Sequence, residues 1–111
     1  MFTSTATRSG DDICLTLAGE LDLADQSFLH QSITRARTGS AATLRIDMRD
    51  VSFIDCAIIS ALIEEHLDAA AAGTRLILIN PQGLVLRVLR VLDLLTHLTE
   101  PIDPIGLPAR P

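Results

Sequence analysis

Hydrophobic residues alternate with other residues near the start of the chain, where Ile13, Leu15 and Leu17 share one face. A period of two is typical of a β-strand with one buried side. Positions 2–7 predict an earlier strand, and the turn residues Ser-Gly-Asp-Asp at 9–12 separate the two segments. We therefore expect an antiparallel hairpin at the beginning of the chain.

The pattern changes to a helical period after position 22. The apolar stripe that predicts this helix consists of Leu29, Ile33 and Ala36. Asp22 or Asp25 can cap its N-terminus, because a short carboxylate accepts hydrogen bonds from the unpaired backbone N–H groups. The helix is expected to continue to about Arg37 and to end before Gly39.

Strand and helix patterns alternate through the second half of the chain. Positions 44–48 and 76–79 predict two further strands, the second of them apolar on both faces. One helix is expected to follow Asp55 and to end at Gly73, and another is expected over 84–92. This order favours parallel strands joined by right-handed crossovers. The predicted fold class is therefore α/β, with a mixed sheet and about three to four helices.

Composition narrows the classes of function. The chain has 111 residues, of which nine are basic and fourteen acidic, and all nine basic residues are arginine. The net charge of −5 argues against nucleic acid and against an anionic membrane surface as partners. The lack of lysine excludes chemistry that needs a Schiff-base lysine or a P-loop lysine.

Positions 1–10 lack the apolar core of a signal peptide, and no apolar run reaches the roughly 18 residues that cross a bilayer. We therefore expect a cytoplasmic location.

Proline and cysteine positions indicate the domain organisation and the redox environment. Four of the five prolines fall within 101–111, which predicts an extended tail after a single domain over 1–100. Cys14 and Cys56 lack the spacing of a metal site or of a secreted disulfide scaffold. We expect no disulfide between them, no bound metal and no cofactor.

Four segments, in order and at matching intervals, resemble parts of the STAS domain family. They are Leu-Ala-Gly-Glu-Leu-Asp at 17–22, the stretch 44–55 that ends in Val-Ser-Phe-Ile-Asp, Gly-Thr-Arg-Leu-Ile-Leu at 73–78, and 85–95 around Arg-Val-Leu. The resemblance implies the mixed α/β fold of the bacterial anti-sigma factor antagonists. It also implies a non-enzymatic module for transcription regulation, whose partner is an anti-sigma factor of the serine-kinase type. The partner-binding residues that it implies are Glu20, Asp22, Asp55, Cys56, Ala57, Ile58 and Ser60.

The sequence departs from the family pattern at the site of phosphorylation. Family members that act as anti-sigma factor antagonists have Asp-Ser-Ser-Gly where this chain has Asp55, Cys56, Ala57 and Ile58. Cys56 stands at the position of the phosphorylated serine, and a thiol is not a substrate for an ordinary serine kinase. We expect the phosphorylation switch to be lost or altered, and we expect Ile58 to add bulk where partners approach.

Three side chains near this site each have a functional and a structural interpretation. At a helix N-terminus Cys56 could become a redox-sensitive thiolate, but the neighbouring Asp55 disfavours negative charge, and a small side chain in the space of serine is the simpler interpretation. Ser60 lies one helical turn after Cys56 and could be a displaced phosphoacceptor. We expect Ser60 to face solvent instead, and we expect Ser52 to be a turn residue.

The carboxylates and histidines suggest a metal or acid–base site as an alternative. Asp22, Asp47 and Asp55 follow successive elements, where carboxylates can bind Mg²⁺ or transfer protons. The STAS resemblance instead assigns Asp22 and Asp55 to partner contact or helix capping. The histidines lack the spacing of metal ligands and are His30, His66 and His97.

A second class of function stays open from sequence alone. STAS domains also serve as accessory subunits of membrane transport or signalling complexes, where no phosphorylation is needed. A small-ligand sensor is a third hypothesis, and it would need a pocket. The oligomeric state is open as well, because exposed edge strands permit a weak dimer without requiring one.

Overall fold

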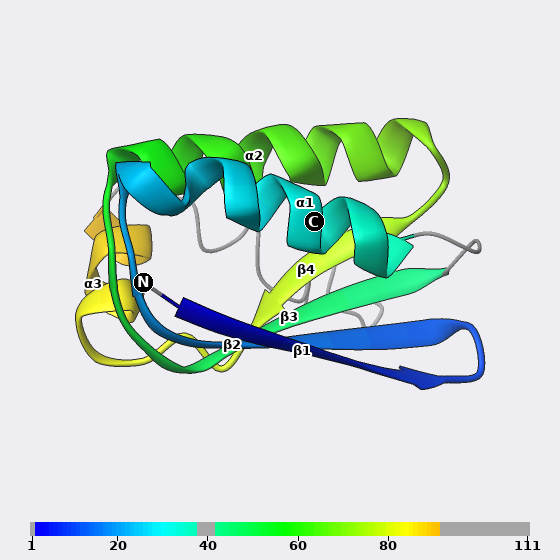
Figure 1. The fold of residues 1–111 in the computed structure, drawn as a ribbon, viewed down its shortest axis with the longest axis horizontal. Helices are drawn as coiled ribbons and strands as arrows, with labels where there is room; N and C mark the ends of the chain where they lie inside the picture. Colours follow the sequence, from blue (N-terminus) through cyan, green and yellow to red (C-terminus); the bar gives the residue numbers. More distant parts are fainter. Residues whose placement is uncertain (1, 38–41, 92–111) are drawn as a thin grey trace.

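The computed structural model describes residues 2–37 and 42–91. Figure 1 shows the strands and helices in the predicted order. The elements are β1 (Phe2–Ser9), β2 (Asp12–Leu21), the 3₁₀ turn η1 (Leu23–Asp25), α1 (Gln26–Arg37), β3 (Thr43–Ile54), α2 (Cys56–Ala71), β4 (Arg75–Ile79) and α3 (Gly83–Val91). The proposed tail at 101–111 lies outside the described residues.

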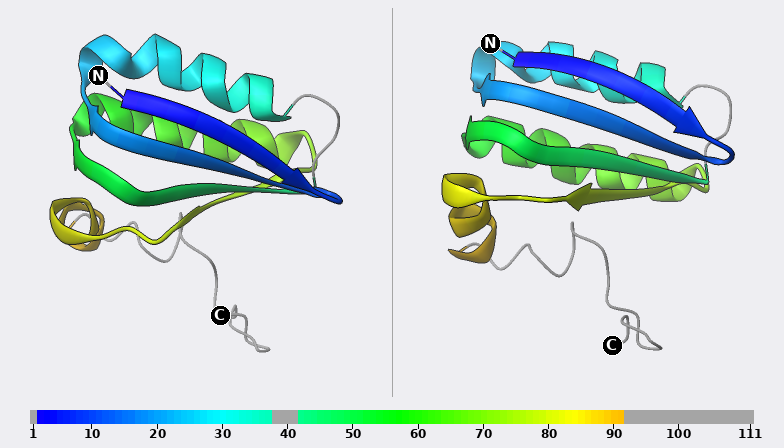
Figure 2. Two further views of the ribbon diagram at one scale, coloured as in Figure 1. Left: turned by 60° about the horizontal axis from the view of Figure 1, so that its bottom comes forward. Right: turned by 90° about the horizontal axis from the view of Figure 1, so that it is seen from below.

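In the described part of the chain, the sheet has four strands in the order β1-β2-β3-β4. β1 and β2 form the predicted antiparallel hairpin, and β2, β3 and β4 are parallel neighbours. Figure 2 shows α1 and α2 side by side on one face of this sheet, while α3 lies at the end of the sheet beyond β4. The mixed α/β fold predicted from the sequence is therefore confirmed, with three α-helices in the described part of the chain.

The core lies between the sheet and its two covering helices. Alternate residues of β2 and β3 point toward α1 and α2, as the period of two requires. Leu17, Leu44 and Ile46 are fully buried there, opposite Leu29 of α1 and Leu62 of α2. Truncation of any one of them to alanine would cost about 2–5 kcal/mol, because the rigid sheet limits how far the cavity can collapse.

Two predicted features of the second half are confirmed in detail. Leu76 and Ile77 of β4 point to opposite faces and are 1% and 3% exposed, so this strand is buried on both sides. Gly73 follows α2 with a φ of 86°, a left-handed conformation that favours glycine after a helix.

β3 is longer than its sequence pattern predicted. We expected Ser52 in a turn, but β3 continues to Ile54, and Ser52 lies within the strand. The pairing with β2 shifts register twice, between Thr16 and Ala18 and again after Gly19, whose φ is 112°. These irregularities interrupt the alternation of buried residues without ending the strand. In the sequence, the interrupted alternation looks like that of a turn.

Candidate protein-interaction site

Asp22 and Asp55 come together because two parallel strands end side by side. Leu21, the last residue of β2, is paired with Ile54, the last residue of β3. The residue that follows each strand therefore emerges at the same end of the sheet, where α2 also begins. Carboxyl ends of parallel strands are common binding sites, because the loops that leave them are free to vary.

Asp55 links both of these segments with one carboxylate. Its Oδ1 accepts a hydrogen bond from the backbone N–H of Ile58 at 3.1 Å, which caps the N-terminus of α2. Its Oδ2 accepts a hydrogen bond from the backbone N–H of Leu23 at 3.0 Å, in the turn that follows β2. The predicted capping role is confirmed, and the second bond fixes the turn against α2.

Asp22 and Asp25 close the turn after β2 through reciprocal hydrogen bonds. Asp22 Oδ1 accepts from the N–H of Ala24 at 3.0 Å, and Asp25 Oδ2 accepts from the N–H of Asp22 at 3.1 Å. This is a capping box, and it caps the 3₁₀ turn η1 that leads into α1. The hydrogen bond from the Asp22 N–H lowers the pKa of Asp25 below its ordinary value, although burial acts in the opposite direction.

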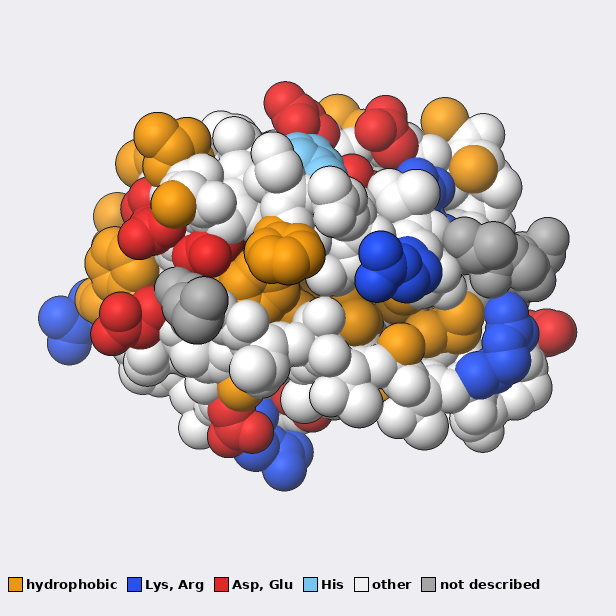
Figure 3. All heavy atoms as spheres, viewed as in Figure 1, with side chains coloured by type: hydrophobic (Ala, Val, Ile, Leu, Met, Phe, Trp, Pro, Cys, Tyr) orange, Lys and Arg blue, Asp and Glu red, His pale blue; other side chains and the backbone are white. Residues whose placement is uncertain are grey.

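Exposed acidic, apolar and thiol side chains gather at this end of the molecule. Figure 3 shows hydrophobic and acidic side chains next to one another where β2 and β3 end and α2 begins, at the left of the view. Leu23 is 66% exposed and Phe53 is 38% exposed, and the register places Phe53 beside Glu20. We call the exposed set the strand-end surface, and it consists of Glu20, Asp22, Leu23, Phe53 and Cys56.

Comparison with known families agrees with this architecture. The model of the STAS domain family matches residues 3–104 of the chain. The chain belongs to the STAS domain family. No curated protein sequence matches it.

Solved structures with the same fold include anti-sigma factor antagonists. One from Mycobacterium paratuberculosis has a TM-score of 0.74 and 18% identity, with 94% of this chain and 90% of that chain covered. The phosphorylated form of the Bacillus cell fate determinant SpoIIAA has a TM-score of 0.64 and 21% identity, with 83% and 85% covered. A sulfate transporter family protein from Wolinella succinogenes has a TM-score of 0.69 and 16% identity, with 83% and 75% covered.

Some matching structures are much longer than this chain. It spans 19% of Mglu, at a TM-score of 0.63 and 24% identity over 70% of this chain. It spans 14% of the murine solute carrier 26 family member A9 anion transporter, at a TM-score of 0.65 and 26% identity over 73% of this chain. The STAS fold thus matches a small part of these two longer chains.

The residues at the start of α2 differ in exposure and in hydrogen bonding. Cys56 is its first residue and has an exposed, free thiol. Ala57 is half-buried, and its carbonyl accepts a hydrogen bond from Gln26 Nε2 at 3.1 Å. Ser60 is exposed, which confirms that it faces solvent.

Ile58 does not lie at the surface, which corrects our expectation that it adds bulk where partners approach. Its side chain is 0% exposed and belongs to the hydrophobic core. Its backbone N–H is bonded to Asp55, so the first turn of α2 directs this side chain toward the sheet. A larger apolar residue at this position therefore fills the core and leaves the strand-end surface unchanged.

The remaining sequence candidates lie elsewhere in the domain. Cys14 is half-buried in β2 and is a free thiol, so the two cysteines form no disulfide. Asp47 Oδ1 accepts hydrogen bonds from the N–H of Arg49 at 3.0 Å and from Asn80 Nδ2 at 3.1 Å, which ties β3 to the loop after β4.

Across residues 2–37 and 42–91, no cluster of His, Cys, Asp and Glu is suited to a metal ion. Over the same residues, no helix is long and apolar enough to cross a membrane.

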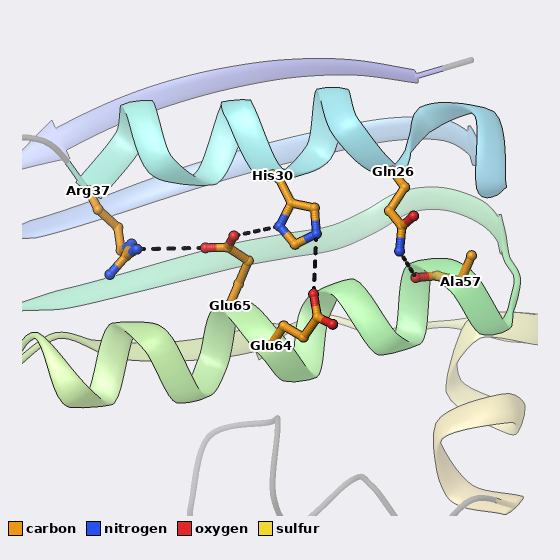
Figure 4. Close-up of polar contacts among 6 residues, drawn as sticks. All are labelled: Gln26, His30, Arg37, Ala57, Glu64 and Glu65. Carbon is orange, nitrogen blue, oxygen red and sulfur yellow. Dashed lines mark hydrogen bonds and ion pairs between the residues drawn. The ribbon is translucent and has the colours of Figure 1, made fainter.

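The sequence did not reveal a polar seam between α1 and α2. Figure 4 shows His30 and Arg37 of α1 pointing toward Glu65 of α2. His30 Nδ1 lies 2.6 Å from Glu65 Oε2, and Arg37 Nη2 lies 3.8 Å from Glu65 Oε1. Histidine spacing along the chain gives no sign of this cluster, because Glu65 follows His30 by 35 positions and Arg37 by 28. His66 contacts the Leu76 carbonyl instead, at 2.9 Å, and His97 lies outside the described residues.

Proposed function

We propose that this chain is a regulatory module that binds an anti-sigma factor of the serine-kinase type through the strand-end surface, in the cytoplasm. The observation that carries the proposal is the exposure of Leu23 and Phe53 beside the N-terminus of α2. Large apolar side chains that stay exposed in a small domain are typical of protein contacts. The Asp55 carboxylate holds the backbone of Leu23 against the N-terminus of α2. The segment that presents the Leu23 side chain is therefore fixed before a partner binds.

Charge favours a partner with basic side chains. Glu20 and Asp22 are both exposed beside the apolar pair, and the whole chain carries a net charge of −5. Arginine or lysine around an apolar pocket of the partner would complement this arrangement. Such complementarity raises the association rate and rejects acidic competitors more than it adds affinity.

The proposed interaction lacks control by serine phosphorylation. Cys56 occupies the exposed first position of α2, and Ala57, which follows it, has no hydroxyl. Both oxygens of Asp55 already accept backbone hydrogen bonds, so this carboxylate is fixed beside position 56. With no acceptor serine at the helix N-terminus, the protein would stay competent to bind at all times, and its abundance or its partner would set the output.

The proposal is tested by affinity capture from native lysate with three immobilised baits. Leu23→Asp removes an apolar contact of the strand-end surface. Leu67→Asp makes the same change at another exposed leucine of similar exposure, 61% against 66%, in the second half of α2. Mass spectrometry should identify a kinase-type anti-sigma factor retained by the wild type and by Leu67→Asp and lost with Leu23→Asp. Retention by all three baits would contradict the proposed surface.

A second candidate function is an accessory subunit of a membrane transport complex. It is supported by the matching structures of a sulfate transporter family protein and of a murine anion transporter. This function also needs no serine at position 56. Recovery of transporter subunits in place of a kinase would favour it and would reject the sigma-factor pathway.

A further inference from the structure

Among residues 2–37 and 42–91, no strand pairs with the outer side of the β1 backbone. β1 is the first strand in the sheet order, and among the described residues it pairs only with β2. Its register with β2 runs without a bulge from Phe2 to Ser9. Edge strands of this length usually carry lysine, proline or a bulge that blocks further pairing. β1 has none of these, and its one charged residue is Arg8.

The two faces of β1 differ in character. Ser4 lies on the helix side, where its Oγ is 3.3 Å from Ser32 Oγ of α1. Phe2 lies on that side as well, with its ring in edge-to-face contact with Phe28 of α1 at 6.3 Å. The opposite face carries threonine at every alternate position, and all of these threonines are exposed: Thr3, Thr5 and Thr7.

We infer that β1 is a self-association surface and that its occupant is β1 of a second copy, paired antiparallel with Thr5 opposite Thr5. A two-fold axis through this pair would run perpendicular to the sheet. Two four-stranded sheets would then join into one continuous sheet, with both sets of helices on the same side.

This register follows from the side chains that it brings together. Each Thr3 would lie opposite Thr7 of the second copy, so that the exposed face forms a ladder of threonine pairs, which favour sheet pairing. Each Phe2 would lie opposite Arg8 of the second copy, so that the one cation of the strand meets an aromatic ring. The two arginines would lie at opposite ends, and no like charges would face each other.

The molecular surface is consistent with a covered edge. Figure 3 shows hydrophobic atoms along the seam between α1 and β1, on the face that would adjoin the second copy. Phe28 is 64% exposed at this seam although it lies on the helix that covers the sheet. Pairing of two β1 strands would extend the sheet below these hydrophobic atoms.

Sedimentation equilibrium with interference optics tests the inference, because the chain has no Trp or Tyr for absorbance. The wild type should show a monomer–dimer equilibrium between micromolar and millimolar concentrations. Thr5→Lys should weaken dimerisation about fivefold at low salt, because it places two lysines opposite each other. Ser60→Lys, an exposed change on α2, is the control and should leave the equilibrium unchanged.

A mixture of variants with opposite charges at position 5 distinguishes a loss of strand pairing from misfolding of a variant. An equimolar mixture of Thr5→Lys and Thr5→Glu proteins should dimerise better than either protein alone, because residue 5 of one copy faces residue 5 of the other. A monomeric wild type at millimolar concentration would overturn the inference. So would a mixture that associates no better than its components.

Cross-linking tests the register itself. In a protein with Cys14→Ser and Cys56→Ser, Thr5→Cys should form a disulfide-linked dimer on mild oxidation, since opposite α-carbons of an antiparallel pair lie about 4.5–5.5 Å apart, within the range that a disulfide spans. Ala6→Cys, on the other face of the same strand, should not. Cross-linking through position 6 in place of position 5 would show that the proposed register is wrong.

Discussion

Asp55 holds two segments of the chain with a single carboxylate. We predict that Asp55→Ala lowers the free energy of unfolding by about 2 kcal/mol, because it removes the cap of α2 and the bond to the Leu23 N–H together. Asp55→Asn should cost less, since asparagine caps helices about as well as aspartate. Urea unfolding followed by far-UV circular dichroism measures both changes.

Asp50 provides the control for this prediction. It is an exposed aspartate in β3, where a change to alanine should stay within about 0.5 kcal/mol. Equal losses of stability for Asp50→Ala and Asp55→Ala would mean that Asp55 does not fix the turn against α2.

The lowered pKa of Asp25 predicts that the stability of the folded protein depends on pH. Its pKa in the folded protein lies below the ordinary value of 3.8, chiefly because its carboxylate accepts the hydrogen bond from the Asp22 N–H. The unfolded chain therefore takes up this proton first as the pH falls. The stabilisation is complete well above pH 3.8 and is lost as the pH drops through the lowered pKa of the folded state.

The test compares thermal midpoints of the wild type and Asp25→Asn from neutral pH downward. The wild type should melt at a higher temperature near neutrality, and its advantage should shrink below pH 3.8. An advantage that stays constant over this range would show that ionisation of Asp25 does not support the turn.

The seam between α1 and α2 depends on one buried carboxylate. Glu65 is 5% exposed and lies between His30 and the half-buried Arg37. We predict that Glu65→Ala costs about 1–3 kcal/mol, because it removes the hydrogen-bonded contact with His30 and the carboxylate that Arg37 faces. Glu64→Ala should cost less than about 0.5 kcal/mol, since that side chain is 64% exposed and its contact with His30 Nε2 is 3.5 Å. Chemical denaturation of the two variants distinguishes them, and equal losses would contradict this account.

Much of the fold was predictable because its elements follow local rules. The alternation around Leu15, the caps at Asp22 and Asp55, and Gly73 after α2 each reflect backbone physics within a few residues. The extension of β3 through Ser52 was missed, because its register shifts are set by the neighbouring β2 and leave no period in β3 itself.

The candidate site was predictable only in part. The resemblance to STAS domains located Asp22, Asp55 and Cys56 at one place, and the paired ends of β2 and β3 agree with that expectation. The burial of Ile58 and the exposure of Leu23 depend on how η1 and α2 pack together, which a hydrophobic pattern alone does not specify. The seam around Glu65 was missed for the same reason.

At the scale of the whole molecule, we propose that this STAS domain binds a kinase-type anti-sigma factor without being switched by phosphorylation. Its strand-end surface is preorganised by backbone hydrogen bonds, and it contains a thiol where the family pattern has a serine. Binding should therefore persist under conditions in which a phosphorylated antagonist would be released.

The most direct test incubates the purified chain with its captured kinase and Mg-ATP, then measures intact mass and the amount of complex together. We predict that the wild type gains no phosphate and stays bound. The comparison is Cys56→Ser, in which an acceptor hydroxyl is restored. Phosphate on Ser52 or Ser60 of the wild type, with loss of the complex, would contradict the account, because the switch would then have moved along the chain.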